Sequence, residues 1–204
     1  SGAARYGWGT SITQCFAYAA FDRIGNAQIL SRAGISFGGG TAESLDLAKR
    51  TWLEDEAFQP LRKHVEEMLV EKYWGVAMVA SDVTDRLIYG LFYTALDDAA
   101  LNAGAASYSL VAQHLSQWFT DQRRWFDALY KAWVSDPELG EANKALLGSI
   151  VSTTLATALA ALQPVAAKAD GLVDAGAAAS LATAAEQIVA AFAALGVTVE
   201  TPAS

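Results

Sequence analysis

Cysteine and histidine are both scarce in this sequence, which has one cysteine and two histidines among 204 residues. Cys15 has no second cysteine to pair with, so no disulfide can form within the chain. This is typical of a reducing compartment, and the N-terminus shows no signal-peptide pattern, so we expect a cytoplasmic protein. Cys15 itself lies on an apolar helix face and is expected to be a small buried hydrophobic residue.

Positive charge is also in short supply. The chain has 14 Lys and Arg residues against 22 Asp and Glu residues, which gives a net charge of −8. No cluster of Lys or Arg is interleaved with aromatic residues. This balance argues against nucleic acid or an anionic membrane surface as a partner.

One stretch, from Ala145 to Ala167, lacks charge altogether. It is long enough to span a bilayer, but it contains Ser, Thr, Gln and Pro. Its largest apolar side chains recur on one helix face, and these are Leu147, Val151, Leu155, Leu159 and Leu162. Such a one-sided helix is typical of close packing against other helices, so we expect a core helix and no membrane span.

Strand-like alternation is absent, and the apolar pattern is helical. The pattern is strongest from Ser107 to Asp136, and we expect the fold to be organised around this helix. Its apolar stripe comprises Val111, Leu115, Trp118, Gln122, Trp125, Leu129 and Ala132. Further aromatic residues widen that surface, namely Phe119, Phe126, Tyr130 and Trp133. The helix should therefore be covered on more than one side, as in the middle of a bundle.

Other helices are predicted over about residues 10–34, 41–54, 60–72, 74–102, 137–163 and 177–195. The expected buried side of the first comprises Ile12, Phe16, Ala20, Ile24, Ala27 and Leu30. The last is nearly all alanine with few large side chains, so we expect it to pack at the periphery. With 53% hydrophobic residues, the chain is expected to form one sizeable all-α core.

A bundle of long helices raises the possibility of a carboxylate-bridged di-iron centre, which requires Glu-x-x-His pairs because side chains three residues apart converge on one ion. Neither histidine fits this motif, because Leu61 stands three residues before His64 and Val111 three before His114. We expect His64 on an exposed ion-pair face, and His114 as a satisfied core or interface residue.

Four aspartates on the predicted helices remain as candidate ligands: Asp22, Asp82, Asp85 and Asp121. Arg124 stands three residues after Asp121, where a ligand histidine would be expected. We therefore predict a salt-bridged vestige of a metal site at Asp22, Asp85, Asp121 and Arg124, with the Arg124–Asp121 contact in the vacant centre. The alternative, a metal bound by all four aspartates, is disfavoured because an adjacent guanidinium repels a cation.

Three segments, residues 19–37, 52–83 and 118–138, together resemble the β subunit of the hydroxylase of bacterial soluble di-iron monooxygenases. That family includes the methane, alkene, propane, phenol and toluene monooxygenases. The most specific piece comprises Asp55, Phe58, Gln59, Pro60, Leu61 and Arg62, followed by Tyr73, Trp74 and Gly75.

The resemblance implies a ferritin-like helical bundle, similar to the catalytic α subunit, that has lost its metal ligands. The chain would then be a non-catalytic structural subunit without a cofactor of its own, and the di-iron centre would lie in the α subunit. Implied partners are that subunit, a second β copy in an α2β2 or α2β2γ2 assembly, a small effector protein and a reductase. The complex would oxidise a hydrocarbon or aromatic compound with O2 and electrons from NADH.

Five aromatic residues are expected to anchor the core or the subunit interface: Tyr89, Phe92, Trp118, Trp125 and Trp133. Two other functions remain open. One is a stand-alone ferritin-like metal oxidase or oxygenase with the all-carboxylate site. The other is a carrier of apolar ligands built on a helical bundle, which no particular residue supports.

The resemblance also suggests a division of the chain. Residues 1–168 would form the ferritin-like domain, without the N-terminal arm and first helices of the family's β chains, which are longer. Residues 169–204 would form a peripheral Ala-rich helix and tail, and they resemble no family that we can name.

Overall fold

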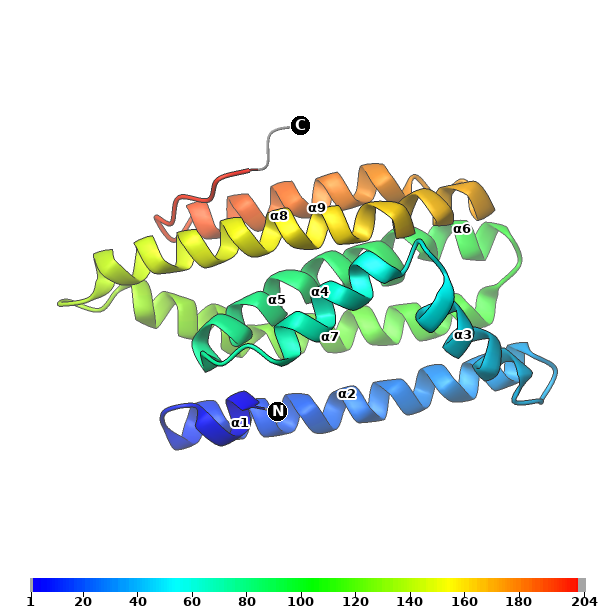
Figure 1. Ribbon diagram of the computed structural model, residues 1–204, viewed down its shortest axis with the longest axis horizontal. Coiled ribbons are helices and arrows are strands. Elements are labelled where there is room, and N and C mark those ends of the chain that lie inside the picture. The colour runs from blue at the N-terminus through cyan, green and yellow to red at the C-terminus, as the bar shows by residue number, and fades with distance from the viewer. Residues whose placement is uncertain (1, 202–204) are drawn as a thin grey trace.

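A computed structural model describes residues 2–201, and every regular element in that range is helical (Figure 1). The elements are α1 (Gly2–Tyr6), α2 (Thr10–Phe37), α3 (Glu43–Glu54), α4 (Gln59–Leu69), α5 (Trp74–Gly90), a π-helix η1 (Leu91–Ala95), α6 (Leu96–Asn102), α7 (Ala106–Val134), α8 (Gly140–Val173) and α9 (Ala177–Ala193). The predicted all-α class is confirmed. Residues 74–102 are helical throughout, as predicted. The π-helix η1 separates the two α-helical segments of this stretch, α5 and α6.

Helix α5 lies at the centre of the bundle. It contacts α1, α4, α7, α8 and α9, whereas α2 runs along the opposite side of the molecule from α8 and α9 (Figure 1). Val79, Val83 and Leu87 on α5, and Leu91 in η1, are each 0% exposed. The fold is therefore organised around α5, and the prediction that gave this place to residues 107–136 was wrong. Helix α5 is buried on nearly all sides, so its apolar residues are not confined to one face. Its sequence therefore lacks the one-sided apolar stripe that marks a helix as part of the core.

Helix α7 is covered on several sides, as predicted, by α2, α5, α6, η1 and α8. Its buried residues are Ser109, Ala112, Leu115, Phe119, Phe126 and Tyr130. Trp118, Trp125 and Leu129 from the predicted stripe are only half-buried, and Ala132 is exposed. The direction of deepest burial is thus rotated by about one residue, or roughly 100°, from the predicted stripe.

Helix α8 continues through Pro164 to Val173, although the sequence predicted an end near Gln163. Proline inside a helix costs about 3 kcal/mol, but here Val165 and Ala166 extend the buried face of Leu155 and Leu162 by another turn. By length and composition alone α8 could cross a membrane. Its buried face packs against α5 and α9, as predicted for a core helix.

Helix α9 belongs to the core, and the prediction of a peripheral helix was wrong. Leu181 and Ile188 are each 2% exposed and Phe192 is 1% exposed. Alanine on the remaining positions lets α9 lie close to α5 and α8, so a few large side chains are enough to seal the space between them. The predicted domain boundary at residue 168 falls inside the continuous helix α8.

Helix α2 presents a more polar face to the bundle than its sequence suggested. Its buried residues are Phe16, Ala19 and Asn26, whereas Ile24 is 60% exposed and Leu30 is 38% exposed. The predicted buried side was therefore correct only in its first half. Because α2 has apolar residues on two sides, periodicity alone could not decide which one faces the core.

Candidate functional site

Two carboxylates on α5 point to different neighbours. Asp82 and Asp85 are three residues apart on a helix with 3.6 residues per turn, so they diverge in direction by about 60°. The Asp82 side chain is 0% exposed and faces α7, whereas the Asp85 side chain is 19% exposed and faces α2. The two groups meet different arginines.

Asp82 is held by Arg86 and Tyr130, and we call these three residues the Asp82 cluster. Arg86 donates to Asp82 Oδ2 from Nε at 2.9 Å and from Nη2 at 2.7 Å, and the Tyr130 hydroxyl donates to the same oxygen at 3.2 Å. The Arg86 guanidinium carbon also lies 5.5 Å from the centre of the Phe192 ring. The cluster therefore joins α5, α7 and α9 in the interior.

Electrostatics keep Arg86 in the Asp82 cluster charged. Burial opposes its charge, but the neighbouring Asp82 carboxylate outweighs this effect and raises the pKa of Arg86. Burial, followed by the negative charge of Asp82, raises the pKa of Tyr130 well above its usual value. Tyr130 is thus a neutral donor, and a permanent cation occupies the interior.

Asp85 forms an ion pair with Arg23 of α2, and Arg23 also donates to the Ala19 carbonyl at 3.2 Å. Burial raises the pKa of Asp85, and the positive charge of Arg23 opposes that rise. The Arg23 side chain is 39% exposed, so this pair is more open to solvent than the Asp82 cluster. It fastens α2 to α5.

The predicted vestigial centre is not at Arg124. Arg124 does pair with Asp121 at 3.0 Å, but their side chains are 79% and 52% exposed on the surface of α7. Asp22 is exposed as well, one residue from the inward-facing Arg23. The prediction that Arg124 fills the centre was therefore wrong. The arginine that is buried in the bundle is Arg86, and its i, i+4 spacing from Asp82 was the sequence signal that could have revealed it.

The residues present do not fit a di-iron centre. Asp82 is bonded by Arg86 and Asp85 by Arg23, so each inward carboxylate already has a cationic partner. Across residues 2–201, no three His, Cys, Asp or Glu side chains gather closely enough to hold a metal ion. The alternative site of Asp22, Asp82, Asp85 and Asp121 fails for the same reason, because its members do not converge.

The two histidines also differ from expectation. His64 is half-buried, and its Nε2 lies 2.9 Å from Thr84 Oγ1 of α5. Burial lowers the pKa of His64, and Glu67 opposes this effect. The prediction of an exposed histidine was therefore wrong, although Lys63 and Glu67 beside it form the expected surface pair at 2.8 Å. His114 is exposed on α7, so it is not a core residue.

The five predicted aromatic anchors are all half-buried and lie at the edges of the core. Tyr89 stacks on Phe119, with ring centres 4.2 Å apart, and Trp118 lies 5.9 Å from Tyr89. Trp125 stacks on Phe126 at 3.8 Å.

The other two anchors lie along the same core. Trp133 meets Trp74 at 6.5 Å, and Phe92 packs against the hydrophobic core. Cys15 is half-buried, less than predicted. Whether the five anchors also contact another subunit stays a prediction.

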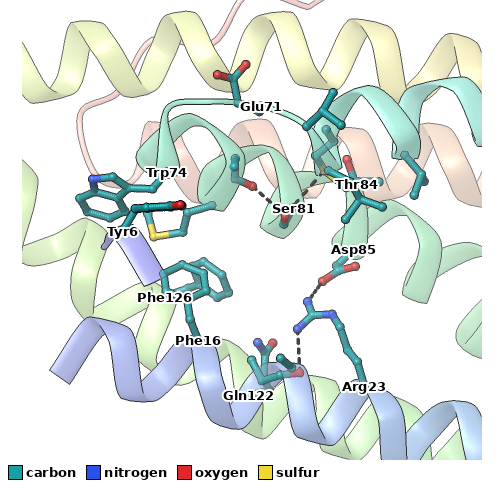
Figure 2. A pocket seen from close by; sticks show the side chains of 18 of the residues that line it. Tyr6, Phe16, Arg23, Glu71, Trp74, Ser81, Thr84, Asp85, Gln122 and Phe126 are labelled. Carbon is teal, nitrogen blue, oxygen red and sulfur yellow. Dashed lines mark hydrogen bonds and ion pairs between the residues drawn. The ribbon is translucent and has the colours of Figure 1, made fainter. Parts of the chain in front are cut away.

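A cavity of about 710 Å³ opens between α1, α2, α4, α5 and α7, on the Asp85 side of α5 (Figure 2). Its apolar wall includes Phe16, Trp74, Met78, Trp125 and Phe126. Its polar residues include Arg23, Asp85, Ser81, Thr84 and Gln122. The sequence gave no indication of this cavity, because its walls come from five separate elements.

The fold and the two aspartate–arginine pairs of α5 define a class of protein. It is a ferritin-like helical bundle in which Asp82 and Asp85 are paired with arginines. Comparison with known proteins gives the family. Residues 1–137 match the Methane/Phenol/Alkene Hydroxylase family. The chain belongs to this family, so the resemblance found in the sequence is confirmed.

Two relatives are oxygenase components of phenol 2-monooxygenase. The chain is 32% identical to component DmpL of Pseudomonas sp. (strain CF600) over 79% of this chain and 48% of that protein. It is 33% identical to component MhpL of Acinetobacter pittii (strain PHEA-2) over 78% of this chain and 47% of that protein. The chain thus spans about half the length of these relatives.

A solved structure shares the fold. The xenon-pressurized phenol hydroxylase from Pseudomonas sp. OX1 superposes with a TM-score of 0.87 at 27% identity, over 98% of this chain and 58% of the other. The ferritin-like fold is therefore confirmed. Because this match covers 98% of the chain, it includes most of the Ala-rich region after residue 168, which resembled nothing in the sequence alone.

Proposed function

We propose that this chain is the non-catalytic structural β subunit of a multicomponent monooxygenase hydroxylase. In this proposal the catalytic α subunit holds the di-iron centre and oxidises an aromatic or hydrocarbon substrate with O2 and electrons from NADH. The relatives named as phenol 2-monooxygenase components favour a phenol as that substrate.

The Asp82 cluster is the observation that carries this proposal. A metal centre in a helical bundle needs free carboxylates and imidazoles, but the interior here holds the Arg86 guanidinium, 7% exposed, against the Asp82 carboxylate. A buried cation in that place would repel an iron ion, and removing it would leave Asp82 unpaired. The cluster thus supports the proposal of a subunit that holds no metal at Asp82.

The outward face of α2 supports a role in an assembly. Tyr18, Phe21 and Ile24 are 67%, 70% and 60% exposed. Three large apolar side chains gathered on one helix face are typical of a protein–protein interface. We call them the α2 outer face and propose that it packs against the catalytic subunit.

The remaining partners follow from the same role. They are a second copy of this chain in the hydroxylase, a small effector protein and a reductase, all in the cytoplasm. The Asp82 cluster consists of residues of this chain alone, so it supports the role of the chain without identifying these partners.

Copurification tests the proposal. The tagged chain should purify from its host with a chain that carries two Glu-x-x-His motifs, and iron should be present in proportion to that partner. Phe21→Asp, at the centre of the α2 outer face, should reduce the recovered partner more than tenfold, because a buried aspartate in an apolar interface is costly. Leu172→Asp, at a position 75% exposed near the end of α8, is the matched control and should leave recovery unchanged.

Two results would contradict this assignment. One is iron bound stoichiometrically by this chain when it is purified alone. The other is that no chain with two Glu-x-x-His motifs copurifies with it. Full recovery of the partner with Phe21→Asp would place the contact on a face other than the α2 outer face.

A further inference from the structure

A smaller cavity, of about 320 Å³, lies between α5, η1, α7 and α9, and two arginines border it. Arg86 reaches it from α5 and Arg123 from α7. Its other polar residues are uncharged, namely Tyr89, Thr94, Ser116, Thr120 and Gln187. Among the residues that the structure describes, no Asp or Glu lines this cavity. The charge on its wall is therefore positive.

Both arginines keep a terminal nitrogen free on this side. Arg86 bonds to Asp82 through Nε and Nη2, and Arg123 bonds to Asp127 through Nη2. The Nη1 nitrogen of each arginine makes no hydrogen bond within residues 2–201 and retains contact with solvent. The Arg86 side chain is only 7% exposed and lines the cavity, so its free nitrogen faces that space.

The two arginines share a weakly held counter-ion. Asp127 Oδ1 lies 3.3 Å from Arg123 Nη2 and 3.5 Å from Arg86 Nη2, at the long end of the hydrogen-bond range. The Asp127 side chain is 58% exposed, so solvent screens both contacts. Arg86 has Asp82 as its main partner, but Arg123 depends on Asp127 alone among the ion pairs of the described chain. A further anion in the cavity would therefore be attracted to both guanidinium groups.

The rest of the wall favours an anion with a hydrocarbon part. Phe119, Ala184 and Ile188 are buried residues that line the same cavity. The planar fork of a guanidinium matches the two oxygens of a carboxylate. The volume is near the lower end of the range of about 300–1,000 Å³ that is typical of small-molecule sites. Thr94 belongs to the π-helix η1, and π-helical turns are frequent at functional sites.

We propose that this cavity binds a small organic carboxylate, whose carboxylate group is held by Arg86 and Arg123 and whose hydrocarbon part lies against Phe119 and Ile188. Asp82 does not line the cavity, so the ligand would lie outside the Asp82 cluster and leave its bonds intact. The site uses residues of this chain alone, so it does not depend on the proposed function.

Binding is tested on the purified full chain by NMR line broadening of butyrate labelled with carbon-13 in the carboxyl group. Butyrate should bind more tightly than acetate, which lacks most of the hydrocarbon part, and butanol should not compete because it lacks the charge. Inorganic phosphate and a short acetylated peptide with one glutamate should compete less well than unlabelled butyrate. These two probes present an anion without a hydrocarbon part and a carboxylate on a protein segment.

Two arginine variants test the charge on the wall. Arg123→Gln should weaken butyrate binding about 10-fold or more, as expected for a lost charge-assisted hydrogen bond. Arg124→Gln is the matched control, because it removes the same charge from the same helix at a side chain that is 79% exposed and outside the cavity. It should leave butyrate binding unchanged.

A change of opposite sign is expected at the shared counter-ion. Asp127→Asn removes the negative charge that competes with the ligand for both arginines, so butyrate should bind about 2- to 5-fold more tightly. Asp121→Asn, which removes an exposed charge that pairs with Arg124, should have no effect. A purely structural role of Asp127 does not predict tighter binding.

A steric variant locates the site. Ala191→Phe places a ring in the cavity from an exposed position of α9 and should abolish butyrate binding. Ala190→Phe, at the neighbouring exposed position outside the cavity, should leave it unchanged. Circular dichroism verifies that every variant is folded.

The proposal is overturned if the folded, unaltered chain does not bind butyrate at millimolar concentration, or if Arg123→Gln and Arg124→Gln weaken binding equally. Weaker binding by Asp127→Asn, or full binding by Ala191→Phe, would also overturn it. Tighter binding of phosphate or of the glutamate peptide than of butyrate would exclude a small organic carboxylate as the ligand.

Discussion

Each side of helix α5 carries an aspartate that is paired with an arginine, but the two pairs differ in how far they are buried. On one side Asp82 is fully buried with Arg86 and Tyr130, and on the other side Asp85 pairs with the partly exposed Arg23 next to a cavity. The first side is closed by α7 and α9, whereas the second is bordered by α2 at the edge of the bundle (Figure 1). One side is therefore closed around its ion pair, and the other borders a cavity.

The largest expected effect is on the closed side. Asp82→Asn leaves the Arg86 guanidinium without its principal counter-charge in the interior, and loss of one partner of a buried pair costs roughly 3–5 kcal/mol. Urea denaturation would measure the loss. Asp85→Asn is the matched variant on the open side and should cost less than half as much, because Arg23 can turn to solvent. Equal losses at the two positions would contradict the distinction between the sides.

A smaller effect is expected for Tyr130→Phe. This change removes the 3.2 Å hydrogen bond to the charged Asp82 and keeps the ring in place, so the free energy of unfolding should fall by about 1–3 kcal/mol. Tyr18→Phe on the exposed face of α2 serves as a control with no expected change. A neutral result at Tyr130 would mean that its hydrogen bond adds nothing to the two that Arg86 donates to the same oxygen of Asp82.

The open side should respond to pH through His64, which bonds to Thr84 next to Asp85. Burial lowers the pKa of His64 from its usual value of 6.5, so just below that pH the unfolded chain binds more protons than the folded chain. Stability should therefore be fully present above about pH 6.5 and should decrease as the pH falls toward the lower folded pKa. His64→Gln should remove this dependence in denaturation curves, and an unchanged pH profile would show that other groups cause it.

The smallest effect is expected at the surface pair of Arg124 and Asp121. Their side chains are mostly exposed, and such pairs contribute about 0–1 kcal/mol. A double-mutant cycle with Arg124→Ala and Asp121→Ala should give a coupling energy in that range. A coupling above about 2 kcal/mol would restore the prediction that this pair is structurally central.

Sequence reasoning predicted the helices and the all-α class, because helical periodicity and capping are local properties. The family came from the resemblance of three segments to known β subunits. It erred where burial depends on neighbours. The Ala-rich α9 carries too few large residues to indicate a core helix, yet Phe192 is 1% exposed because α5 and α8 supply the rest of the packing. For the same reason the alternation of apolar faces on α2 could not show which one is covered.

The candidate site was only partly predictable. The missing Glu-x-x-His motif was visible in the sequence, and Asp82 and Asp85 were identified as inward candidates. The arginine expected in the interior was taken to be Arg124, paired with Asp121, because spacing alone does not show which helix face is buried; the buried arginine is Arg86, paired with Asp82. The cavity beside Asp85 required the structure, since five elements contribute to its walls.

The most direct test of the non-catalytic role is the location of iron in crystals of the purified hydroxylase, measured by anomalous scattering at the iron absorption edge. We expect iron only in the partner chain, with the Arg86 guanidinium against Asp82 in this one. An iron peak between α5 and its neighbouring helices, bound by Asp82 or Asp85, would contradict the account.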